Sequence, residues 1–171
     1  MELILPHDFY SITKDKFLLL DTSVFIDTLL SPVRFEELFS KLKANGCTLV
    51  TLDAVQIEFI KGALDEVSFK KKELVINGIV DSIIPISKDI WDESLNLLKS
   101  YKEDGKAASV ADLLLAGTIA KFSRTIFLIT KNLNDFPTNI FTLETHFSLV
   151  HRKGLHSYGI LSFEKVEEQP F

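Results

Sequence analysis

Phe17-Leu-Leu-Leu-Asp-Thr-Ser-Val-Phe-Ile-Asp27 begins with four apolar residues in a row and then reaches Asp21. An apolar run this short, with a polar residue at its end, indicates a strand that is buried on both faces. Residues 24–30 then have the composition of a short helix that ends near Ser31-Pro32, since proline cannot continue a helix. A buried strand that leads almost directly into a helix is typical of parallel α/β sheets.

Strands and helices keep alternating through the rest of the chain. This order predicts a mostly parallel sheet with helices on both faces, which is a three-layer α/β/α sandwich. For residues 159–163 we expect an added edge strand. The other expected strands cover residues 47–52, 79–86, 125–129 and 140–143, and the other expected helices cover residues 34–43, 53–65, 69–77, 87–101 and 109–122, with loops at 103–106 and 131–137.

The composition excludes several classes of protein. Of the 171 residues, 46% are apolar and 25% are charged, which is typical of a globular domain and not of a disordered chain. Cys47 is the single cysteine, so we expect no disulfide within the chain, no cysteine-based zinc site and a cytoplasmic location. We also expect no secretory signal and no membrane span, because the longest apolar runs are too short to cross a bilayer.

The net charge of −5 counts against a protein that binds nucleic acid through bulk positive charge. It is compatible with an enzyme that holds phosphate through a metal ion and a few local cations. Lys70-Lys-Lys72 is the only basic run, and a solvated helix face is the simplest interpretation of it.

Four acidic residues follow the predicted strands in a way that indicates one shared site. Asp21 ends the first strand, Glu58 lies on the helix after the second, Asp112 opens the helix at 109–122, and Asp135 lies in the loop after the fourth. Because ligands of parallel sheets bind beyond the carboxyl ends of the strands, we expect these acids to meet there. No single acid is persuasive, so the prediction depends on their convergence.

Converging carboxylates imply a bound cation. They repel one another and raise one another's pKa, and a divalent ion removes that conflict. Oxygen ligands of this kind suit Mg²⁺ or Mn²⁺ better than zinc. Such an ion can bind a phosphate oxygen, lower the pKa of an attacking water and stabilise the leaving oxygen, so the pattern favours phosphodiester hydrolysis.

Each acid also has an ordinary structural interpretation. These alternatives are a helix cap for Asp21, a surface pair with Lys61 for Glu58, a capping box with Ser109 for Asp112, and a turn within residues 132–137 for Asp135.

Three stretches resemble the motifs of PIN domains. Leu18-Leu-Leu-Asp-Thr-Ser-Val-Phe-Ile-Asp27 resembles the opening motif, an apolar strand followed by Asp, a small hydroxyl residue and an apolar helix with a second Asp. Ser109-Val-Ala-Asp-Leu-Leu-Leu-Ala-Gly-Thr-Ile-Ala120 resembles the helix that has an early acid and then small residues. Leu128-Ile-Thr-Lys-Asn-Leu-Asn-Asp-Phe136 resembles the late motif, and Glu58 matches the helix glutamate in order and context.

The resemblance implies a PIN-like nuclease domain over residues 17–145, with an N-terminal extension at 1–16 and a C-terminal extension at 146–171. PIN domains are metal-dependent nucleases that act on RNA, and many small ones are VapC-type toxins that a partner antitoxin neutralises. The resemblance therefore implies an endoribonuclease with Mg²⁺ or Mn²⁺, an RNA substrate, a protein antitoxin and a homodimer.

Carried over by motif, the resemblance also assigns roles to residues. It implies that Asp27 is a helix-face acid of lower rank, in a salt bridge. The four histidines all lie outside the motifs, and we expect no pair of them near the sheet edge to act as a general base. The implied catalytic and metal-binding acids are Asp21, Glu58, Asp112 and Asp135, and the implied supporting residues are Ser23, Thr130 and Asn132.

Other α/β enzymes fit less well. A phosphatase of the haloacid dehalogenase type needs a second Asp two residues after the first, where this chain has Ser23. A receiver domain needs an Asp at the end of its third strand, where this chain has Ile86-Ser87. The alternatives that stay open are a non-catalytic PIN-shaped module that binds RNA or protein, and a housekeeping RNA-processing nuclease.

Overall fold

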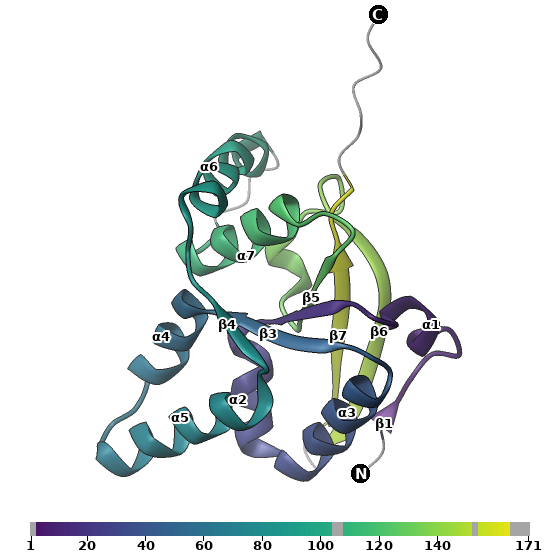
Figure 1. Cartoon of the computed structure of the whole chain (residues 1–171), viewed down its shortest axis with the longest axis vertical. Coiled ribbons are helices and arrows are strands. Elements are labelled where there is room, and N and C mark those ends of the chain that lie inside the picture. The colour runs from purple at the N-terminus through teal and green to yellow at the C-terminus, as the bar shows by residue number, and fades with distance from the viewer. Residues whose placement is uncertain (1–2, 104–107, 152–153, 165–171) are drawn as a thin grey trace, which may run out of the picture.

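The computed structural model describes residues 3–103, 108–151 and 154–164, which form a single mixed sheet with helices packed on it (Figure 1). The strands are β1 (Leu3–Ile4), β2 (Phe17–Leu20), β3 (Thr48–Leu52), β4 (Ser82–Ile84), β5 (Ile126–Thr130), β6 (Thr142–His151) and β7 (Gly154–Ser162). The helices are α1 (Phe9–Thr13), α2 (Thr22–Leu30), α3 (Pro32–Ala44), α4 (Asp53–Lys61), α5 (Glu66–Ile79), α6 (Lys88–Glu103), α7 (Val110–Lys121) and the short 3₁₀ turn η1 (Leu133–Asp135).

Four neighbouring strands at one end of the sheet are parallel, as the sequence predicts, and the other three pair antiparallel. The strand order is β1-β6-β7-β5-β2-β3-β4, and β5, β2, β3 and β4 pair in parallel. Leu18, Leu19 and Leu20 of β2 are completely buried. This agrees with the continuous apolar run, because a central parallel strand faces packed helices on both sides.

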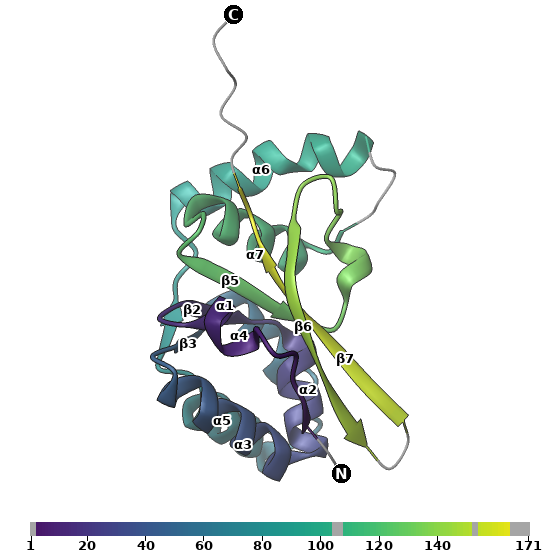
Figure 2. The ribbon, with the colours of Figure 1, turned by 90° about the vertical axis from the view of Figure 1, so that its right-hand side faces the viewer.

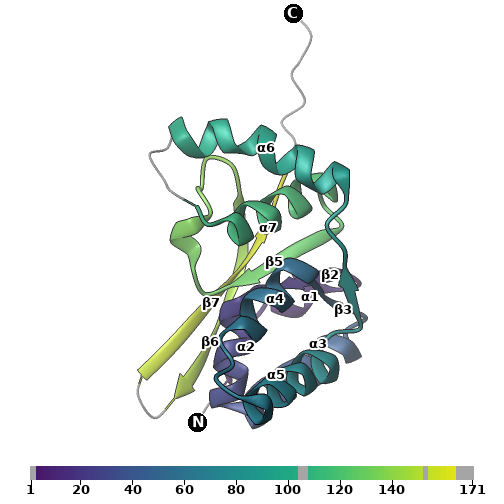
Figure 3. The ribbon, with the colours of Figure 1, turned by 90° about the vertical axis from the view of Figure 1, so that its left-hand side faces the viewer.

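Helices cover both faces of the parallel strands and make the expected three layers. Helices α6 and α7 lie on one side, and α3 and α5 lie on the other (Figures 1 and 2). Figure 3 shows α2, α4 and α7 grouped beside the parallel strands, and α4 contacts both α2 and α7. The elements that carry the predicted acids are therefore neighbours.

The C-terminal part of the chain differs from the prediction. The strand expected at 140–143 overlaps β6 only at residues 142–143, and β6 continues to His151, so the expected boundary at residue 145 falls inside a strand. The strand expected at 159–163 belongs to β7, which lies between β6 and β5 and is not at an edge. Figure 2 shows the β6–β7 hairpin running on past the parallel strands. In β6 polar residues interrupt the apolar ones, so a search for continuous apolar runs does not find this ten-residue strand.

The N-terminal segment packs against this hairpin. Strand β1 pairs with β6, and Phe9 of α1 is fully buried with its ring edge against Phe147 at 5.8 Å. Residues 3–16 thus contribute to the same hydrophobic core as the rest of the described chain. Among the described residues, no helix is long and apolar enough to cross a membrane.

The interface between α6 and α7 depends on Gly117. A Cβ atom at this position would lie 2.1 Å from Ser94 Oγ and 2.8 Å from the carbonyl oxygen of Ile90. Only glycine allows this close approach, which fixes the position of α7 and so of the residues at its N-terminus. The loop expected at 103–106 lies, except for residue 103, outside the described residues.

Candidate active site

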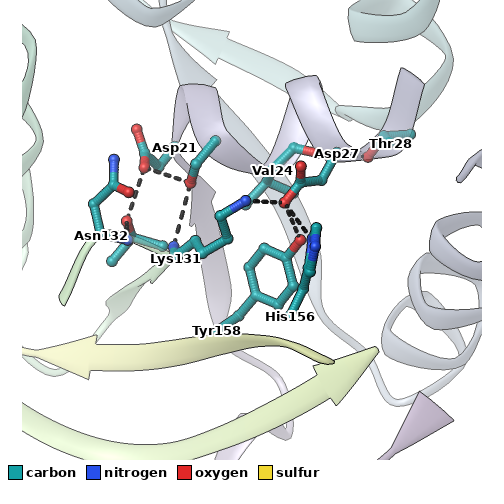
Figure 4. Close-up of polar contacts among 10 residues, drawn as sticks. Asp21, Val24, Asp27, Thr28, Lys131, Asn132, His156 and Tyr158 are labelled. Atoms are coloured by element: carbon teal, nitrogen blue, oxygen red, sulfur yellow. Dashed lines mark hydrogen bonds and ion pairs between the residues drawn. The ribbon is translucent and has the colours of Figure 1, made fainter. Parts of the chain in front are cut away.

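Asp21 lies where β2 ends and α2 begins. Its backbone is extended in the position of a helix cap, but its carboxylate makes no capping hydrogen bond. Instead Asp21 Oδ2 accepts hydrogen bonds from Ser23 Oγ at 2.7 Å and Thr130 Oγ1 at 2.8 Å (Figure 4). Asp21 is therefore the N-cap residue of α2, as the structural alternative expected, but its carboxylate makes no capping hydrogen bond and is oriented by two hydroxyl groups.

The environment of Asp21 opposes its negative charge. The residue is 3% exposed. Burial raises the pKa of Asp21, the hydrogen bonds from Ser23 and Thr130 lower it, and the charge of Asp112 raises it again, so that the pKa lies above its ordinary value. A carboxylate in this position favours either a proton or a cation.

Backbone groups after β5 extend the hydrogen bonding around Asp21. The N–H of Lys131 donates to Ser23 Oγ at 3.2 Å, and the N–H of Asn132 donates to Thr130 Oγ1 at 3.0 Å. The first and last sequence motifs are thus joined through side chains that hold Asp21. Asn132 contributes here through its backbone.

Glu58 reaches the same region from α4. Its Oε2 accepts a short hydrogen bond from Thr22 Oγ1, next to Asp21 in sequence. Among the ion pairs of the described residues, none joins Glu58 to Lys61, so the surface-pair interpretation is wrong.

Asp112 lies in the first turn of α7, and its capping interpretation is confirmed. Its Oδ2 accepts from the N–H of Ser109 at 3.0 Å and from Ser109 Oγ at 2.6 Å. The N–H of Asp112 donates back to Ser109 Oγ at 3.1 Å. This capping box holds the carboxylate at the N-terminus of the buried helix, where the partial positive charge of the helix favours an anion.

Three of the predicted acids line one open pocket of about 420 Å³. They come from the end of β2, from α4 and from α7, which the topology makes neighbours. The lining residues are Asp21, Thr22, Ser23, Ile26, Asp27, Glu58, Ser109, Asp112, Lys131 and Asn132. We call this the acid pocket.

Asp135 is not among the residues that line the acid pocket. It is half-buried in the turn η1. Burial raises the pKa of Tyr101, and the charges of Asp112 and Asp135 raise it further, so both carboxylates act on this hydroxyl. The hydroxyl itself is buried and has no hydrogen-bond partner in the described part of the chain. Asp112 and Asp135 therefore both act electrostatically on Tyr101, but Asp135 does not line the acid pocket.

The donor chemistry of the acid pocket fits a hard divalent cation. Asp21, Glu58 and Asp112 supply only carboxylate oxygens, which suit Mg²⁺ or Mn²⁺. In the described residues, however, no three acidic, histidine or cysteine side chains are already arranged around a common point. Glu58 instead accepts a hydrogen bond from Thr22, and Asp112 accepts one from Ser109. Because carboxylates repel one another, each is bonded to a nearby hydroxyl group and does not turn toward the others.

A second cluster beside the pocket surrounds Asp27. Asp27 is 5% exposed, and its Oδ2 accepts from Tyr158 Oη at 2.5 Å and from Lys131 Nζ at 2.6 Å (Figure 4). His156 Nδ1 lies 3.3 Å from the same oxygen. Burial raises the pKa of Asp27, but these bonds and the charge of Lys131 outweigh it and hold the pKa below its ordinary value. The salt bridge expected for Asp27 is confirmed.

Lys131, His156 and Tyr158 are not among the site residues predicted from the sequence. Two of them lie on β7, which was assigned to an extension, so they were not considered near the sheet edge. His156 and Tyr158 are two residues apart, and alternation along a strand puts such side chains on one face. This two-residue spacing, directly before the predicted strand at 159–163, is the sequence signal that could have placed both side chains on one face of a strand.

Comparison with known proteins supports this description. A search of curated proteins finds no match to the sequence. A similar fold occurs in the structure of VapBC2 from Rickettsia felis bound to a promoter DNA fragment, with a TM-score of 0.58 and 18% identity over 70% of this chain and 90% of that chain. VapBC-1 from nontypeable Haemophilus influenzae gives a TM-score of 0.57, with 20% identity over 70% of this chain and 90% of that chain. DNA-bound VapBC from Salmonella typhimurium gives a TM-score of 0.58, with 19% identity over 71% of this chain and 90% of that chain.

At this level of identity the solved structures show a common fold. The sequence match is more specific, because the PIN domain model covers residues 18–135. This range is most of the chain and includes Asp21, Glu58 and Asp112. The chain therefore belongs to the PIN domain family.

Proposed function

We propose that this protein is a divalent-metal-dependent endoribonuclease that hydrolyses phosphodiester bonds of RNA. The observation that carries the proposal is that Asp21, Glu58 and Asp112 line one pocket. The pKa of Asp21, which is buried, lies above its ordinary value. Membership of the PIN domain family supports the same activity. Asp135 is kept as a fourth acid, on the turn η1 and outside the lining of the pocket.

The residues of the acid pocket have separate roles in this proposal. Mg²⁺ or Mn²⁺ held by Asp21, Glu58 and Asp112 would bind a phosphate oxygen, activate water and stabilise the leaving oxygen. Ser23 and Thr130 keep the Asp21 carboxylate in one orientation, and the loss of such an orienting bond commonly costs about 10–100-fold in activity.

A cleavage assay on labelled RNA tests the proposal. We expect Asp21→Asn and Asp112→Asn to lower the rate by roughly 100-fold or more, because losing about 3 kcal/mol of charge stabilisation corresponds to two decades of rate. EDTA should abolish cleavage by the wild type, and added Mg²⁺ or Mn²⁺ should restore it. Asp81→Asn is the control, since Asp81 forms an ion pair with Lys43 and does not line the pocket.

Two results of this assay contradict the proposal. Equal cleavage by the wild type and both pocket variants would refute the residue assignment. RNA binding without cleavage under any metal would instead support a non-catalytic PIN-shaped module.

We further propose that a small antitoxin protein binds this chain and inhibits it. The proteins of similar fold are VapBC assemblies, and apolar side chains surround the pocket. Ile26 on the pocket wall is 48% exposed, and Ile57 and Val110 in the adjoining groove are 66% and 65% exposed. A protein that covered these side chains would also close the pocket, which links binding to inhibition.

Co-expression with the product of a small neighbouring gene tests this partner. We expect a stable complex that does not cleave RNA and a growth defect when the chain is expressed alone. Failure of any neighbouring product to bind or to inhibit would favour a housekeeping RNA-processing nuclease. The proposed homodimer is tested in the same preparation by sedimentation.

A further inference from the structure

The acid pocket contains one basic side chain among several carboxylates. Of the described residues that line the pocket, Lys131 alone is basic, whereas four carboxylates face the same space. A phosphodiester would add another negative charge to that space. With a net charge of −5, the chain offers little general attraction for RNA, so a local cation matters more here than in a basic protein.

Lys131 is anchored at its backbone, and its side chain is partly exposed. Its backbone N–H donates to Ser23 Oγ at 3.2 Å, and Ser23 in turn bonds Asp21, so the start of the side chain is tied to the candidate metal ligand. Its ammonium lies 2.6 Å from Asp27 Oδ2, and its side chain is 36% exposed. An ammonium group has three N–H donors, so one bond to Asp27 does not exhaust its capacity.

The partner of this ammonium is itself firmly held. Asp27 Oδ2 also accepts from Tyr158 Oη at 2.5 Å and has His156 Nδ1 at 3.3 Å. If the ammonium shifts toward a substrate, Asp27 keeps these other partners and does not become a bare buried charge, which is what makes most buried pairs costly to open. Tyr158 comes from β7 and Asp27 from α2, so the hairpin fixes the direction in which Lys131 extends.

We propose that Lys131 binds a phosphate of the RNA substrate at the acid pocket and that Asp27, held by Tyr158, is its positioning residue. The inference rests on the proposed nuclease function and deepens it by assigning the group that recognises the substrate backbone. A lysine acts on phosphate as a point charge and reads no base, so the contact is independent of sequence.

The competing explanation is that Lys131 only neutralises buried Asp27. The two explanations differ in salt dependence, because each phosphate contact to single-stranded nucleic acid contributes a slope of about 0.7 in log affinity against log salt. A purely structural lysine contributes none.

The experiment measures kcat and KM for cleavage of a fluorescein-labelled single-stranded RNA at saturating Mg²⁺ over a series of KCl concentrations. For Lys131→Met we expect a KM increase of about 10–100-fold, since a charge-assisted bond is lost, with a smaller change in kcat. The slope of log kcat/KM against log salt should become shallower by about 0.7. Lys131→Arg should recover most of the KM and the slope, because a guanidinium also binds phosphate.

Lys43→Met is a matched control. Lys43 pairs with Asp81 at 2.7 Å and is 39% exposed, close to the values for Lys131, but it does not line the acid pocket. We expect its KM and salt slope to equal those of the wild type. Tyr158→Phe tests the positioning role: KM should rise while the slope stays the same, because the cation is kept and only its support is lost.

Thermal unfolding of each variant separates folding from binding. If Lys131→Met does not fold, the double variant D27N/K131Q replaces the ion pair with two amides and makes the same test without a buried unpaired charge. An unchanged KM and slope in a folded Lys131 variant would overturn this inference alone. No RNA cleavage by the wild type would overturn it together with the proposed function.

Discussion

Asp21→Asn should make the protein more stable in the absence of metal, although it removes a proposed metal ligand. Both hydroxyl donors, Ser23 and Thr130, bond the same oxygen, Oδ2, so an asparagine can keep both bonds with its carbonyl oxygen. What it loses is a charge that burial and Asp112 disfavour, which is why the pKa of Asp21 is raised. In EDTA at neutral pH we expect a gain of about 0.5–2 kcal/mol, as is common when a strained functional group is relaxed.

The pH dependence of this gain has a definite sign. The folded pKa of Asp21 lies above its unfolded value, so the native state binds the proton more tightly and the wild type becomes more stable as pH falls through that folded pKa. The variant has no such group. The difference between the two proteins should therefore be largest at neutral pH and shrink toward acid.

Metal should reverse the order of stability. A ligand at 100 times its Kd stabilises the native state by about 2.7 kcal/mol, which exceeds the expected gain of the variant. Saturating Mg²⁺ should thus raise the melting temperature of the wild type above that of the variant, whose site is weakened. In a chain of this size about 1 kcal/mol corresponds to 2–4 °C, so thermal unfolding resolves each step.

Asp81→Asn is the control of opposite sign. Burial raises the pKa of Asp81, but Lys43 and the N–H of Leu49 lower it more, so removing this charge should reduce stability at neutral pH. If Asp21→Asn is less stable than the wild type in EDTA, the argument from a buried, unfavourable charge is refuted.

The remaining predictions concern packing, capping and acid stability. Gly117→Ala should lower the free energy of unfolding by about 1–3 kcal/mol through overpacking against α6, whereas Gly78→Ala, with open space at its Cβ, should raise it by up to about 1 kcal/mol, both measured in urea. Ser109→Ala should cost about 0.5–2 kcal/mol as a lost helix cap and alter cleavage as well, since the same hydroxyl bonds Asp112. Because the folded pKa of Asp27 is lowered, its contribution to stability is present at neutral pH and is lost as pH falls through that value, so Asp27→Asn should flatten the acid limb of a pH titration of melting temperature.

The parallel half of the fold was predictable because its signals are local. Strands β2, β3, β4 and β5 correspond to four of the predicted strands, and each of the first three is followed by a helix. A central strand must be apolar throughout, and such runs stand out in a sequence. The helix ends were less accurate: α4 stops at Lys61, and the next helix starts from a capping box at Asp65 that the sequence analysis missed.

The antiparallel half was not predictable in the same way. The position of β6 and β7 depends on pairing between segments far apart in the chain, such as Thr130 with Gly159. A Cβ at Gly159 would lie 2.3 Å from Leu133 Cδ2, so the hairpin also sets where η1 lies. The place of β7 inside the sheet follows from these contacts and from no local pattern.

The candidate site shows the same division. Motif order and strand ends were sufficient to nominate Asp21, Glu58 and Asp112, because residues that follow parallel strands must reach one sheet edge. Which of their oxygens are already bonded, the position of Asp135 outside the pocket wall, and the joining of Lys131 to Asp27 depend on distances between side chains from separate elements. Periodicity along a chain indicates whether a residue is buried, but not which side chains surround it. A pKa or an ion pair depends on distances of a few ångströms between side chains, and only the packing of the elements sets those distances.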